Sequence, residues 1–140
     1  MADGGAMERA NRLRSAGEQA RGRDRALACR NYEEAVALLR GCGEGLLLAH
    51  TVRHLGDVRC EAGEWEEAGP CYVEALALYR AHPAAPAMHL ANALRAMAVW
   101  MEHGGARAEA RGLWEEARGL YAECGIAAGV AECERRMSER

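Results

Sequence analysis

The segment of the chain that begins at Ala49 is repeated from Ala91 onward, and this periodicity constrains the fold more than any other feature. When the two segments are laid over each other, identical residues recur in the same order. The further identical pairs are Arg53 and Arg95, Gly63 and Gly105, Glu67 and Glu109, Ala68 and Ala110, Glu74 and Glu116, Ala75 and Ala117, Leu78 and Leu120, and Tyr79 and Tyr121. Such a repeat predicts one supersecondary unit that is used more than once and stacked on its neighbour.

The composition predicts that this unit is helical. Ala, Leu, Glu and Arg dominate the chain, and Ala and Leu are among the strongest helix formers. Phe is absent and isoleucine occurs once, as Ile126, so the residue types that favour strands are scarce. The length of 140 residues suits one domain. We therefore expect an all-α fold.

Each copy carries the same alternation of small and large residues. The first copy contains Val52, Leu55-Gly56, Gly63, Trp65, Ala68, Tyr72 and Ala75, and the second contains Leu94, Met97-Ala98, Gly105, Ala110, Trp114 and Ala117. A weaker copy precedes them, with Tyr32, Ala35 and Leu39. This pattern resembles the tetratricopeptide repeat (TPR) family, in a bacterial form with repeats of about 42 residues.

The resemblance implies an all-α, right-handed superhelical solenoid of antiparallel helix pairs. We expect about three repeats in a single domain over residues 1–140, at about 5–42, 45–81 and 86–123, and a capping helix over 126–138. The individual helices should cover roughly 5–28, 31–41, 45–62, 65–81, 86–103, 106–123 and 126–138. In the weaker first copy, Gly22 and Arg23 stand where the Leu-Gly pair is expected. Pro70 lies early in a predicted helix, where we expect it to bend the helix without breaking it.

The resemblance also implies a concave groove lined by the first helix of each pair. The residues expected to point into it are His50, Arg53 and Asp57 in one repeat, and Asn92 and Arg95 in the next. A guanidinium group suits a carboxylate, and an Asn side chain can both donate to and accept from a peptide backbone. These side chains predict a groove for a peptide or partner protein, possibly an acidic one.

An alternative is that the two arginines are bonded within the chain. Arg53 and Arg95 would then pair with Asp57, Glu61 or Glu102 and would leave little for a ligand.

The predicted function is that of a protein-binding scaffold without a cofactor. Hydroxyl side chains other than Tyr are limited to Ser15, Thr51 and Ser138, and none lies in a nucleophile motif. The glycine-rich segment 41–45 lacks the Lys-Ser/Thr that a phosphate-binding loop needs. We therefore expect no enzyme activity and no catalytic residues. The alternative function is a structural module that self-associates into a homo-oligomer without a peptide ligand.

Other partners are disfavoured by charge and hydropathy. The net charge of −3 and the lack of a basic cluster argue against nucleic acid. The sequence has no apolar run of about 18 residues and no apolar signal segment, so we expect no membrane contact and a cytoplasmic location. His50 and His54 have an interval that can hold a metal, but the neighbouring Arg53 would repel a cation, so we expect no metal site. The six cysteines form no C-x-x-C pair and are expected to be reduced.

Overall fold

The structure, a computed structural model, describes residues 2–139. These residues form seven helices and no strand, which confirms the predicted all-helical class. The helices are α1 (Ala2–Ala20), α2 (Arg25–Arg40), α3 (Gly45–Glu61), α4 (Trp65–Arg80), α5 (Ala87–His103), α6 (Arg107–Glu123) and α7 (Ala127–Ser138).

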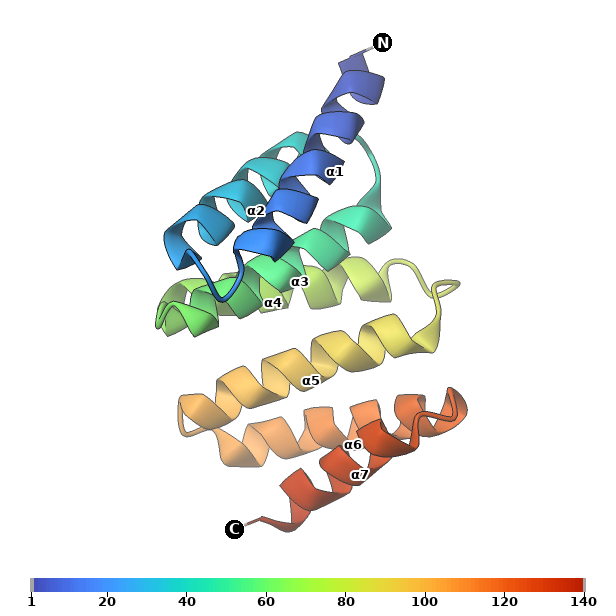
Figure 1. Cartoon of the computed structure of the whole chain (residues 1–140). Helices are drawn as coiled ribbons and strands as arrows, with labels where there is room; N and C mark the ends of the chain where they lie inside the picture. The colour runs from blue at the N-terminus through green and yellow to red at the C-terminus, as the bar shows by residue number, and fades with distance from the viewer. Residues whose placement is uncertain (1, 140) are drawn as a thin grey trace. The chain divides into compact units, whose positions relative to one another are not determined.

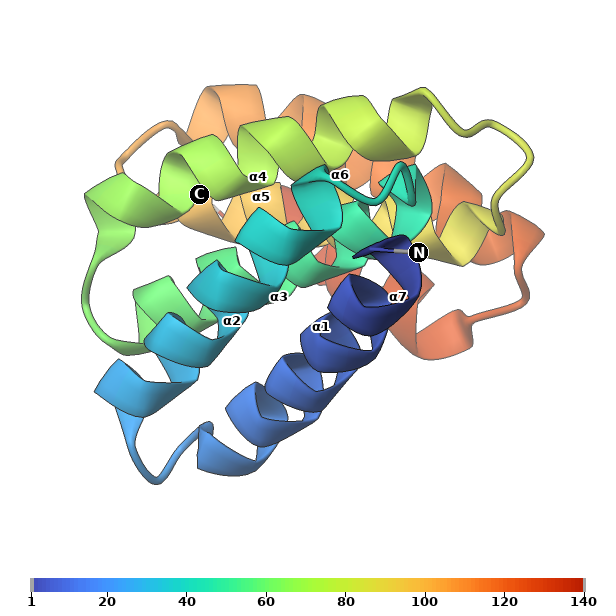
Figure 2. The same ribbon diagram turned by 90° about the horizontal axis from the view of Figure 1, so that it is seen from above.

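The chain divides into two compact units. Unit 1 extends to Leu78 and unit 2 begins at Tyr79. Within unit 1, α1 packs against α2 and α2 against α3, and within unit 2, α5 packs against α6 and α6 against α7 (Figure 1). Figure 2 shows α1 and α2 running side by side. Consecutive helices therefore pack against each other, as expected for helix pairs. The handedness of the solenoid, its TPR-like arrangement and the single domain stay predictions.

The helix boundaries confirm the sequence-based prediction from residue 45 onward and correct it before that point. Helices α3 to α7 begin and end within one residue of the predicted positions, and α4 continues through Pro70. The prediction of one helix over 5–28 and a second over 31–41 is wrong, because α1 ends at Ala20 and α2 already begins at Arg25. Gly22 adopts a φ of +82°, which favours glycine, and the Asp24 carboxylate caps α2 by accepting from the Leu27 N–H at 3.1 Å.

A close contact between a glycine and an aromatic ring joins the two helices of each pair in unit 1. A Cβ atom added at Gly17 would lie 2.9 Å from the Tyr32 ring, and one at Gly56 would lie 2.8 Å from the Tyr72 ring. Gly17 is therefore the counterpart of Gly56, which corrects the assignment of that position to Gly22-Arg23. The first repeat is shorter than the second, because Gly17 and Gly56 lie closer together in the sequence than Ala49 and Ala91.

The hydroxyl group of each tyrosine bonds to the acidic residue that follows the glycine. Tyr32 donates to Glu18 at 3.1 Å, and Tyr72 donates to Asp57 at 2.6 Å. Both rings are buried, so an unpaired hydroxyl would cost about 1–3 kcal/mol. In each pair, the glycine of the first helix lets the tyrosine ring pack closely. The acidic residue after it satisfies the hydroxyl group of the same tyrosine.

Small side chains fill the remaining helix contacts. Alanines that are fully buried recur through both units: Ala10, Ala28, Ala35, Ala49, Ala68, Ala75, Ala91, Ala98, Ala110 and Ala117. Trp114 is 1% exposed and supplies the bulk of the unit 2 core where unit 1 has Tyr72. The six cysteines are free, and Cys29, Cys71 and Cys133 are buried among these residues. The alternation of small and large residues in the sequence is thus the packing pattern of the core.

Each unit contains an ion pair between exposed side chains. Arg40 pairs with Glu74 at 2.8 Å, and Arg80 pairs with Glu116 through two hydrogen bonds of 2.9 Å. The two glutamates each follow the core aromatic residue by two positions. Exposed ion pairs typically contribute less than about 1 kcal/mol, so these pairs add little to the stability of each unit.

The packing predicts that replacing two glycines of unit 2 by Ala will have opposite effects on the free energy of unfolding. Gly129→Ala should lower the free energy of unfolding by about 1–3 kcal/mol, because its new Cβ would lie 2.5 Å from the Tyr121 ring. The control is Gly119→Ala in α6, where nothing lies within 4 Å. It should raise the free energy of unfolding by about 0.5–1 kcal/mol through helix propensity. Urea unfolding measures both, and equal effects would mean that α7 is not packed on Tyr121 as described.

Candidate functional site

Two of the predicted groove residues, Arg53 and Asp57, are bonded to each other in unit 1. Arg53 Nη1 lies 3.3 Å from Asp57 Oδ2, and the two side chains are 17% and 21% exposed. Asp57 also accepts the hydrogen bond from Tyr72. Burial raises the pKa of Asp57, although the bond from Tyr72 and the charge of Arg53 oppose that rise. The alternative pairing of Arg53 with Asp57 is therefore the one observed.

The guanidinium group of Arg53 still has unused capacity. Its Nε atom is buried and has no hydrogen-bond partner among the residues that the structure describes. The cost of such a buried donor is about 1–3 kcal/mol. Arg53 therefore keeps one donor that its pairing with Asp57 does not use.

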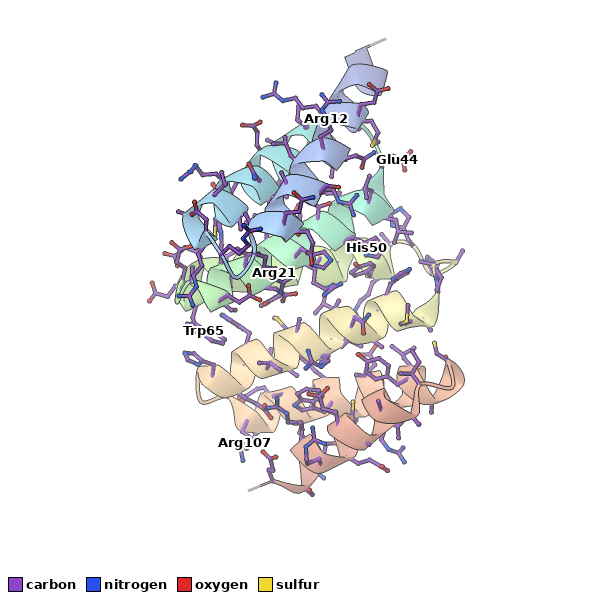
Figure 3. All side chains as sticks on the ribbon, viewed as in Figure 1. Arg12, Arg21, Glu44, His50, Trp65 and Arg107 are labelled. Atoms are coloured by element: carbon purple, nitrogen blue, oxygen red, sulfur yellow. The ribbon has the colours of Figure 1, made fainter. Side chains whose placement is uncertain are left out.

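Arg21, at the beginning of the α1–α2 turn, ties this turn to α3 and was not predicted as a site residue. Its Nε lies 3.0 Å from both carboxylate oxygens of Glu61, and its Nη2 lies 2.7 Å from Oε2. Figure 3 labels this side chain where the end of α1 crosses α3. The hydrogen bond to Glu61 raises the pKa of Arg21, so the guanidinium group stays charged throughout the neutral range.

His54 lies beside this ion pair and is held neutral. Its ring stacks on Tyr32, with ring centres 6.0 Å apart and planes 18° apart. Burial, followed by the charges of Arg53 and Arg21, lowers the pKa of His54 to about 4. His54 Nδ1 lies 3.5 Å from Arg21 Nη1, and because an arginine only donates, Nδ1 acts as acceptor and Nε2 carries the proton.

His54 also borders a hollow of about 200 Å³ in unit 1. It is lined by Arg14, Ser15 and Glu18 from α1, Tyr32 from α2 and His54 from α3. Within residues 2–139, the Arg14 guanidinium donates one hydrogen bond, to the side-chain oxygen of Asn11 at 3.2 Å. We name this hollow, with its five lining residues, the α1–α3 hollow.

Sequence analysis missed the α1–α3 hollow because it placed the first helix in the wrong register. The shift that aligns Gly17 with Gly56 also aligns Arg14 with Arg53. Arg14 therefore occupies, in the first copy of the repeat, the position that Arg53 and Arg95 occupy in the two later copies. The signal that could have found it is the Gly17-Glu18 pair followed by Tyr32, which matches Gly56-Asp57 followed by Tyr72.

The predicted residues of unit 2 are also bonded within the chain. Asn92 accepts a hydrogen bond of 2.7 Å from the Tyr121 hydroxyl. Arg95 donates two bonds to Glu132, of 2.6 and 3.1 Å, and these bonds lower the pKa of Glu132. The partner of Arg95 is thus on α7, and was not among the acids that the sequence suggested.

Glu102, which the sequence suggested as a partner for the arginines, is bonded to other residues of unit 2. It accepts from Trp114 Nε1 at 3.0 Å and from Arg136 at 2.9 Å. The Arg136 guanidinium lies 5.4 Å from the centre of the Trp114 ring, within the range of a cation–π interaction. Glu102 therefore helps to hold α7 and α6 against α5.

The five predicted site residues are therefore distributed over both units. His50, Arg53 and Asp57 lie on α3 in unit 1, and Asn92 and Arg95 lie on α5 in unit 2. His50 is partly buried and is labelled on α3 in Figure 3. Direct contact is shown for Arg53 and Asp57, so the joint groove of all five stays a prediction.

Two other classes of site are missing from residues 2–139. That range contains no group of three or more His, Cys, Asp or Glu side chains arranged to hold a metal ion. None of its helices combines the length and the apolar character that a membrane crossing demands.

Comparison with known proteins adds no family to this description. No protein-family model matches the chain, and no curated protein matches it. The resemblance to the TPR family therefore stays a prediction that rests on the residue pattern.

His54 should make the protein less stable in mild acid. The unfolded chain takes up a proton at the ordinary His pKa of 6.5, whereas the folded chain resists it until about pH 4. The free energy of unfolding should therefore fall between pH 6.5 and 4, by about 1–2 kcal/mol once the partial exposure of the ring is allowed for.

Urea unfolding at pH 7 and pH 5 tests this effect on the wild type and on His54→Gln. The variant lacks the titrating group, so it should lose less stability on acidification. Asp57, whose raised pKa acts in the opposite direction, is common to both proteins. Parallel pH profiles would contradict the burial of His54 against Tyr32.

Proposed function

We propose that the chain is a protein-interaction module of the tetratricopeptide type, which binds a peptide or a segment of a partner protein on the faces of its first helices. The observation that carries this proposal is the α1–α3 hollow, where Arg14 and Ser15 have hydrogen-bonding capacity that internal bonding leaves unused. A cytoplasmic scaffold without enzyme activity or cofactor belongs to the same proposal.

The polar groups around the hollow differ in how far they are engaged. Arg21 is engaged mainly by Glu61 and also contacts His54, and the Tyr32 hydroxyl is engaged by Glu18. Arg14, in contrast, has one neutral acceptor, and the exposed hydroxyl of Ser15 makes no hydrogen bond within residues 2–139. Unused donors on a recessed surface are what a polypeptide ligand needs, because its backbone offers carbonyl acceptors throughout.

Arg53 and Arg95 belong to the proposed surface in a lesser role. An acidic ligand would have to compete with Asp57 for Arg53 and with Glu132 for Arg95. Exchange of one carboxylate for another gains little free energy, whereas a ligand at Arg14 replaces a single bond to Asn11. We therefore expect Arg14 to contribute more to binding than either predicted arginine.

The test begins with selection of peptides from a random display library against the full chain. Enriched peptides should perturb the backbone amide signals of α1 and α3 in unit 1, measured by two-dimensional NMR, more than those of α2. Arg14→Ala should weaken their binding at least tenfold, because the loss of one charged hydrogen bond costs a free energy that corresponds to such a change in affinity. Arg107→Ala, on the exposed first residue of α6, is the matched control and should leave affinity unchanged.

Sedimentation of the same samples distinguishes the alternative of self-association. A monomer that binds selected peptides supports the proposal. An oligomer that dissociates when Arg14 or Arg95 is substituted, without any peptide enrichment, would support a structural module instead and contradict the proposed function.

A further inference from the structure

We infer that the α1–α3 hollow recognises a carboxamide, the side chain of a Gln or Asn in the bound segment, in preference to a carboxylate or an ammonium group. This inference rests on the proposed function, because it names the ligand group that this surface takes. It concerns residues of unit 1 alone.

The charges that line the hollow balance. Arg14 and Glu18 supply one positive and one negative charge at neutral pH, and Tyr32, Ser15 and His54 supply none. Just outside, Arg21 is bonded to Glu61 and also lies 3.8 Å from Glu18 and 4.0 Å from Asp57, and Arg53 is bonded to Asp57, so the outer charges are of both signs. A ligand group with net charge would therefore gain one favourable partner and meet one of its own sign.

The hydrogen-bonding groups of the hollow are also mixed. Tyr32 occupies Oε2 of Glu18, and no donor within residues 2–139 bonds to Oε1. Arg14 and the Nε2–H of His54 are donors, and Ser15 can act as either. The lining thus offers at least one acceptor and two donors.

A carboxamide matches this set better than either charged group. It brings an NH₂ group for the Glu18 carboxylate and a carbonyl oxygen for Arg14 or His54. A carboxylate has no proton for Glu18 and would be repelled by it, and His54 stays neutral and supplies no compensating charge. An ammonium group has no acceptor for Arg14 or for His54 Nε2.

The hollow also has room for this ligand group. Its volume of about 200 Å³ accommodates an amide on one or two methylene groups.

The inference is tested with the peptides selected against the full chain. Peptides that bind wild type should share Gln or Asn at one position, and Gln→Glu or Gln→Lys at that position should weaken binding at least tenfold. Glu18→Gln removes the negative charge but keeps an oxygen that accepts from Tyr32. This variant should therefore bind the Glu-containing peptide more tightly than the Gln-containing one.

The control variant is Glu8→Gln, an exposed change on the same helix, which should keep the wild-type preference for Gln. Peptides that perturb α1 and α3 but bind equally with Gln or Glu would overturn this inference and leave the proposed function intact. Peptides whose preference is unaffected by Glu18→Gln would overturn it too. Failure to enrich any peptide would overturn the proposed function, and the inference with it.

Discussion

The contact between a tyrosine ring and a glycine of the preceding helix is the constraint on which unit 1 depends. Gly17 under Tyr32 and Gly56 under Tyr72 leave no room for a Cβ atom, so the ring of the second helix lies directly on the backbone of the first at these positions. The aromatic ring supplies the buried apolar area, and its hydroxyl needs a polar partner in the same place. That requirement fixes an acidic residue directly after each glycine.

The electrostatics of the α1–α3 hollow follow from this arrangement. Glu18 and Asp57 stand on the first helices because the tyrosine hydroxyls need them, and arginines gather around these acids. His54 is enclosed between Tyr32 and the arginines, which keeps its ring neutral. The same packing that joins the helices therefore produces a recess of mixed polarity.

The sequence predicted the fold well wherever its signals were local. The turn glycines Gly63 and Gly105 have positive φ values, and the helices around them lie where the pattern placed them. The first pair was misplaced because Ala35 was aligned with Ala68, which set Gly22-Arg23 opposite Leu55-Gly56, whereas the structure matches Gly17 and Tyr32 to Gly56 and Tyr72. The i, i+4 pairing of Arg53 with Asp57 was foreseen as an alternative. The bond from Arg95 to Glu132 joins α5 to α7, and local spacing gives no information on such contacts.

The separation between packing residues and surface residues on α1 and α3 bears on how this protein can evolve or be redesigned. Glycine and its ring partner must be inherited together, because either one alone leaves a clash or a void. Arg14, one helical turn before Gly17, is only partly buried and donates a single hydrogen bond, to Asn11. Single substitutions at Arg14 can therefore change the proposed binding surface while the contact of Gly17 with Tyr32 stays intact, and a designer can vary this position on an unchanged backbone.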